Sequence, residues 1–163
     1  CIKHVVDMVS QKQPTQDDQF YNILIILTRG VINDIDKVVE QVVRATNYPM
    51  SIIIVGLGKS NKAKFKNLEA LDGEEDEEGK SQLIDKNGNK AKRDIVQFCV
   101  FREFRHNYFE YAKELLAEIP QQIKEYMEER GILPNNEMVK QKLRENAMGV
   151  DHVEEEKEKE KDL

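Results

Sequence analysis

The chain has 163 residues, of which 39% are hydrophobic and 34% charged, and its formal net charge is −6. This size fits one globular domain, the acidic balance argues against a nucleic-acid partner, and no run of about 20 apolar residues is available to cross a bilayer. Cys1 and Cys99 lack the spacing of a disulfide framework, and Cys99 lies in an apolar run that predicts a buried free thiol. We therefore expect a reduced, intracellular protein.

Hydrophobic periodicity divides the chain into alternating helices and strands. Runs rich in β-branched residues, typical of strands covered on both faces, are at 20–27, 50–55 and 95–101. Helical spacing is found at 2–9, 35–43, 61–71 and 107–130. Residues 2–9 look like the last turns of a longer helix, and Asn33 or Asp34 is placed to cap the next one.

The remaining segments are polar or interrupted. Pro120 predicts a kink or two abutting helices within 107–130, where Tyr108 and Leu116 are among the apolar positions. A polar insertion at 72–93 carries an Asn-Gly turn signal that favours a hairpin. The charged tail at 135–163 is expected to be partly helical or disordered.

Strands that alternate with helices predict an α/β fold: a doubly wound, mostly parallel sheet with helices on both faces. Three strands make a thin sheet, and the strand at 20–27 would leave an apolar edge in need of a partner. We therefore expect residues 1–134 to be the C-terminal half of a larger domain, and the isolated chain to be poorly folded or self-associating.

Several segments in order resemble one known family. They read Tyr21-Asn-Ile-Leu-Ile-Ile-Leu-Thr-Arg-Gly-Val-Ile-Asn-Asp-Ile, Pro49-Met-Ser-Ile-Ile-Ile-Val-Gly-Leu-Gly, Leu71-Asp-Gly, Arg93-Asp-Ile-Val-Gln-Phe-Cys-Val-Phe-Arg, Leu115-Leu-Ala-Glu-Ile-Pro-Gln-Gln and Gly131-Ile-Leu-Pro. Together they are similar to the C-terminal von Willebrand factor A-type domain of copines, which is Rossmann-like, over residues 1–134.

The resemblance implies a non-enzymatic binding protein. Copines bind phospholipid membranes in a calcium-dependent way through two N-terminal domains, and nothing similar to those domains is present in these 163 residues. Calcium, anionic phospholipid and recruitment from the cytoplasm to the plasma membrane are thus expected of the full-length parent, with unknown target proteins for this part. The alternative is a degenerate, metal-independent interaction module without a membrane role.

A-type domains often bind a divalent cation through three loops at the carboxyl ends of the strands. The third loop, a Thr-Asp-Gly in the family, reads Thr28-Arg29-Gly30 here. A guanidinium cannot ligate a cation, so Thr28 is at best a remnant of the site and we expect no metal or cofactor in this chain. Asp34 also matches a family position, but a helix cap is the favoured interpretation.

Other candidate sites are weaker than their structural explanations. The acidic stretch 72–79 lacks the spacing of an EF-hand and is typical of a solvated loop, and Gly56-Leu57-Gly58 lacks the third glycine of a nucleotide loop. The basic and aromatic residues at 101–108 could contact phosphate or an acidic partner, although a helix start surrounded by long side chains is favoured. His4, His106 and His152 are too far apart to predict a hydrolase site.

Overall fold

The computed structural model describes residues 1–30, 34–58, 65–72, 83–104, 106–136 and 141. Three strands form one sheet: β1 (Asn22–Thr28), β2 (Met50–Gly56) and β3 (Val96–Val100). The helices are α1 (Ile2–Val9), α2 (Ile35–Ala45), α3 (Lys66–Glu69), α4 (Tyr108–Leu115) and α5 (Ile119–Glu128), and a 3-10 turn, η2 (Phe101–Phe104), follows β3.

The sheet is parallel throughout and has the order β1-β2-β3. Asn22 pairs with Met50 and Thr28 with Gly56, so the two first strands are in register along their whole length. β2 is the central strand and all seven of its residues are buried. This arrangement confirms the predicted α/β class, because parallel neighbours require a crossover connection such as α2 between them.

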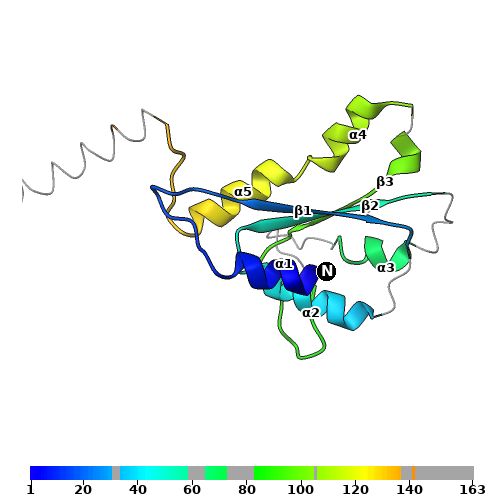
Figure 1. Cartoon of the computed structure of the whole chain (residues 1–163), viewed down its shortest axis with the longest axis horizontal. Coiled ribbons are helices and arrows are strands. Elements are labelled where there is room, and N and C mark those ends of the chain that lie inside the picture. Colours follow the sequence, from blue (N-terminus) through cyan, green and yellow to red (C-terminus); the bar gives the residue numbers. More distant parts are fainter. Residues whose placement is uncertain (31–33, 59–64, 73–82, 105, 137–140, 142–163) are drawn as a thin grey trace, which may run out of the picture.

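Helices cover both faces of the sheet (Figure 1). α1, α2 and α3 lie on one side, where Val6, Val42 and Leu68 join the larger core over β2. α4 and α5 lie on the other side, where Ile53 and Val55 of β2 contact Ile119 and partly buried neighbours. Side chains of successive strand residues point to opposite faces, so β2 supplies both cores at once.

β1 departs from the prediction that its strand is covered on both faces. Leu24 and Ile26 pack against the larger core, whereas Ile23, Ile25 and Leu27 are 44%, 55% and 65% exposed. These three alternate with the packed residues and therefore face the side of α4 and α5. The main contacts of α4 and α5 are with β3 and β2, and the exposure of these three side chains fits the predicted apolar edge.

The helical prediction for 107–130 resolves into two helices. α4 ends at Leu115, and Pro120 occupies the first turn of α5, where the missing N–H of proline is tolerated. Tyr108 and Leu116 are 70% and 49% exposed, so their assignment to the apolar face is wrong. Asn107 caps α4 by accepting the Glu110 N–H.

The other differences are local. Of the predicted 61–71 helix, residues 61–64 lie outside the described residues, and α3 covers four of the rest; Phe65, Leu68 and Leu71 are buried as expected. The turn in the polar insertion exists, with an antiparallel bridge between Ile84 and Lys90. The prediction for the tail at 135–163 falls almost entirely outside the described residues. Among the residues that the structure describes, no helix is long and apolar enough to cross a bilayer.

Candidate functional site

Thr28, which the resemblance predicts to be a remnant of a metal site, lies at the carboxyl end of β1. The Thr28 hydroxyl accepts the Gly30 N–H at 3.2 Å and its carbonyl accepts the Leu57 N–H at 2.7 Å, so both oxygens serve the turn. Asp34 is the N-cap of α2 by position, but it makes no side-chain cap bond and pairs with Lys37 at 2.7 Å. Within the described residues, Thr28 has no cluster of metal-ligating side chains beside it.

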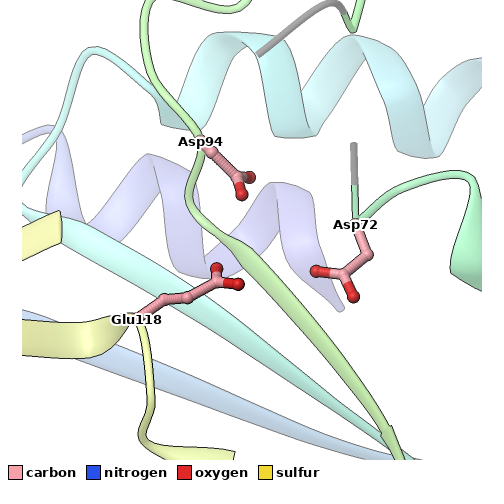
Figure 2. Close-up of side chains that lie close together, drawn as sticks. All are labelled: Asp72, Asp94 and Glu118. Atoms are coloured by element: carbon pink, nitrogen blue, oxygen red, sulfur yellow. The ribbon is translucent and has the colours of Figure 1, made fainter. Parts of the chain in front are cut away.

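A different group of acids meets at the outer edge of β3 (Figure 2). Asp72 follows α3, Asp94 precedes β3, and Glu118 precedes α5. One carboxylate oxygen from each lies within 4.8 Å of the other two. They come from both faces of the sheet and converge where β3 has no strand neighbour.

Backbone geometry explains why acids collect there. The Ile95 carbonyl accepts the Ile52 N–H of β2. Because successive residues of a strand direct their backbone groups to opposite sides, the N–H groups of Val96 and Phe98 point away from β2. Asp94 accepts the Val96 N–H at 3.1 Å, and Asp72 accepts the Phe98 N–H. The two carboxylates thus take the donors that another strand would otherwise use.

The cluster holds a proton near neutral pH. Burial raises the pKa of Asp72 to about 7, and the negative charges of Glu118 and Asp94 add to the rise. Three carboxylate oxygens at this spacing are also ligands that a hard cation accepts. Asp72 and Asp94 bind backbone N–H groups, and Glu118 accepts from the Gln122 amide at 3.2 Å, so we assign no ion to them.

Arg93 is the most buried cation of the described chain, at 3% exposed. It lies in the segment predicted as a polar insertion, and the structure corrects that interpretation. Its guanidinium donates to the carbonyls of Tyr48 (2.6 Å), Met50 (3.1 Å) and Thr46 (3.2 Å), and it lies 4.9 Å from the centre of the Tyr126 ring. Carbonyl dipoles and an aromatic face therefore take the place of bulk water around the charge.

A chain of hydrogen bonds connects this cation with the acidic cluster. Arg93 donates to the Tyr21 hydroxyl at 2.9 Å, and the Tyr21 and Ser51 hydroxyls are hydrogen-bonded at 2.8 Å. Ser51 donates to Gln122 at 2.5 Å, and Gln122 donates to Glu118. Because the single Ser51 hydroxyl proton goes to Gln122, Tyr21 must donate to Ser51. The donors therefore all point from the buried Arg93 toward the partly buried Glu118, and the two opposite charges stabilise each other through polarised groups.

The loop after β2 has the shape of a turn and not of a phosphate cradle. A Cβ on Gly56 would lie 3.0 Å from the Phe65 ring, so this position needs glycine for packing. Gly58 has φ +93°, a left-handed conformation that favours glycine. Both glycines are explained by the path of the chain, as the sequence indicated.

Comparison with known proteins identifies the fold's relatives. A profile of the copine family matches residues 1–135. The chain belongs to the copine family. It is 42% identical to Copine-C of Dictyostelium discoideum over 117 residues, 72% of this chain and 20% of that protein. It is also 42% identical to Copine-E over 135 residues and 40% identical to Copine-B over 127 residues, both from the same organism.

These 163 residues span about a fifth of the length of the copines they match. The match agrees with the segments that carry the resemblance, and three of those segments each contribute one acid of the cluster. Asp72 follows Leu71, Asp94 follows Arg93, and Glu118 closes the Leu115-Leu-Ala-Glu segment. In this chain these three segments therefore meet in space at the edge of β3.

Two features of the site have no signal in the sequence. The three acids are 22 and 24 residues apart in sequence, and only the fold brings them together. Arg93 looks like the end of a polar stretch because nothing local marks its acceptors, which lie 43 to 72 residues away. The acidic stretch was expected to be solvated, but Asp72, its one described member, is half-buried.

The remaining candidates are dispersed. Cys99 is buried, as predicted, and burial raises the pKa of its thiol to about 11. His4 and His106 are exposed and His152 lies outside the described residues. Around 101–108, Phe101 and Phe104 pack on Tyr111, while Arg102 is exposed and Arg105 is not described.

Proposed function

We propose that this part of a copine is a non-enzymatic module for binding proteins, and that it binds them without a bridging metal ion. Calcium-dependent binding of anionic phospholipid is then a property of parts of the longer protein outside these residues. The observation that carries the proposal is the loop after β1, where Arg29 stands at the position of the family's carboxylate. A guanidinium repels a cation, and both Thr28 oxygens already accept N–H groups.

The chemistry of the described residues supports a binding role. The Cys99 thiol is buried and its raised pKa leaves almost no thiolate at neutral pH, so it is a poor nucleophile. The acids of the cluster are held by backbone and amide donors. The exposed apolar side chains of β1 offer a surface that another polypeptide can cover.

A calcium-dependent sedimentation assay with phosphatidylserine-containing vesicles tests the division of roles. The full-length copine should sediment with vesicles only when calcium is present, and the 163-residue chain should stay in the supernatant with or without it. Sedimentation of the short chain with calcium would show that lipid binding lies within these residues. If neither protein sediments, the alternative holds: an interaction module without a membrane role.

Calorimetric titration with Mg²⁺ and with Ca²⁺ tests metal independence separately. We expect no binding heat at millimolar metal for the chain. Arg29→Asp restores one carboxylate beside Thr28 and is the matched variant. Binding by the chain that is lost when Thr28 is replaced by Val would contradict the proposal, because it would show a working metal site at this loop.

A further inference from the structure

The turn at residues 85–89 contains a chemically reactive pair of residues. Asn87 is followed by Gly88, and no other asparagine of the 163 residues precedes a glycine. The turn belongs to the green loop that projects beyond α2 in Figure 1, and both residues are exposed. A Cβ at Gly88 would meet no other atom within 4 Å, so the space beside this peptide bond is open to solvent.

An Asn-Gly pair can modify itself without an enzyme. The glycine nitrogen attacks Cγ of the asparagine, a C–N bond forms, and the side-chain amide leaves as ammonia with the proton of the glycine N–H. Water then opens the cyclic imide at either of its carbonyl carbons, which gives aspartate or isoaspartate. One amide and one water thus become one carboxylate and one ammonium ion, with no oxidation. Glycine favours the attack because no Cβ obstructs its nitrogen.

Asp85 holds both residues of this pair. Its carboxylate accepts the Asn87 N–H at 2.8 Å and the Asn89 N–H at 2.9 Å, and its carbonyl accepts the Gly88 N–H at 3.0 Å. The peptide between Asn87 and Gly88 is therefore fixed at both ends. This restricts the rotation about the Asn87 Cα–C bond that brings the Gly88 nitrogen against Cγ, and the proton that must leave this nitrogen is held by a carbonyl.

We propose that Asn87 is a site of slow self-deamidation, and that Asp85 sets the rate by holding the turn closed. The reaction then proceeds from the fraction of molecules in which the bonds to Asp85 are open, so its rate follows the local stability of the turn.

The product changes the charge of a polar cleft of about 480 Å³ beside α2. Asn87 lines this cleft together with Arg44, Lys90 and Lys92, so conversion adds one negative charge among these cations. Isoaspartate also lengthens the main chain by one carbon atom within the turn that joins Ile84 to Lys90, and this weakens their antiparallel bridge. The chain thereby gains, with age, an altered surface at this cleft.

Incubation of the 163-residue chain at about pH 8, folded and in urea, measures the reaction. Mass spectrometry of a peptide that contains both Asn87 and Asn89 follows the conversion of each. Asn87 should convert about 10- to 1000-fold more slowly in the folded chain than in urea, because only open turns react. Asn89 lies in the same turn but precedes Lys90, so it should stay intact and is the internal control.

Two variants test the role of Asp85. Asp85→Ala removes the acceptor of two N–H groups and should raise the rate in the folded chain at least about fivefold. Asn89→Ala removes only the side-chain bond to Asp85 at 2.8 Å and should give a smaller rise; it serves as the test if circular dichroism shows that Asp85→Ala is unfolded. Asp17→Ala, in an exposed loop, is the matched control and should leave the rate unchanged.

Three results would overturn the proposal. The first is conversion of Asn89 as fast as that of Asn87. The second is an Asn87 rate in the folded chain that equals the rate in urea, or that is more than about 1000-fold below it. The third is an unchanged or slower conversion in the folded variants, since a slower one would show that the Asp85 carboxylate promotes the attack.

Discussion

Replacing Asp72 with Asn should make the fold more stable at pH 8 and leave its stability almost unchanged near pH 4. The pKa of Asp72 is about 7 in the folded chain and 3.8 for an ordinary Asp. The folded protein therefore holds an extra proton between about pH 4 and pH 7, and its free energy of unfolding falls as pH rises through that window. Asn keeps an oxygen for the Phe98 N–H but carries no charge to be buried.

The expected gain follows from the same pKa values. A rise from 3.8 to about 7 corresponds to at most about 4 kcal/mol at about 1.4 kcal/mol per pKa unit. Asp72 is only half-buried, and water screens its charge, so we expect about 1 to 2 kcal/mol at pH 8.

Urea unfolding at matched protein concentration, from pH 4 to pH 8.5, measures the difference between the two proteins. Asp17→Asn, in an exposed loop, is the control for the loss of one negative charge. A difference that stays constant with pH, or that favours Asp72 at pH 8, would refute the assignment of a buried, proton-holding carboxyl.

Three further predictions concern the packing around Arg93 and Gly56 and the exposed side chains of β1. Arg93→Gln should lower the free energy of unfolding by about 3 kcal/mol in denaturant melts, because buried carbonyls lose their donor; a change below about 1 kcal/mol would contradict this. Gly56→Ala should cost about 1 to 3 kcal/mol in the same assay, since the new methyl group meets an aromatic ring at 3.0 Å; an unchanged melt would show that the ring moves freely. The 163-residue chain should self-associate in sedimentation velocity and Ile25→Lys should shift it toward monomer, whereas a sharp, reversible, concentration-independent melt of a monomer would defeat that expectation.

The sequence was sufficient to predict the helices and strands whose hydrophobic pattern is regular. The β-branched run that becomes β2 and the apolar stripe of α2 have one consistent interpretation each, and both are confirmed within a few residues. Tyr108 shares a helical face with Tyr111 and Leu115, which pack on the smaller core, but it is the first residue of α4 and is exposed. Periodicity identifies the apolar face of a helix, and only the fold shows how far along that face the core extends.

The candidate site was less predictable for a physical reason. Thr28 and Arg29 could be found because the family's loop is contiguous in sequence. The acids at the edge of β3 and the acceptors of Arg93 come from elements far apart in the chain, and they meet only through the pairing of β3 with β2. A single sequence contains no local pattern for such a meeting, so these residues had to come from the fold.

The two borders of the sheet are chemically unequal, and this sets the stoichiometry of any assembly built by strand pairing. The β3 border has carboxylates on the N–H groups of Val96 and Phe98, so an incoming strand would have to displace charge. The β1 border has the exposed apolar side chains of Ile23, Ile25 and Leu27 instead. Assembly by strand pairing can therefore proceed through β1 only. Two copies joined through β1 would have acids at both free borders of the joined sheet, which gives a closed dimer and not a fibre.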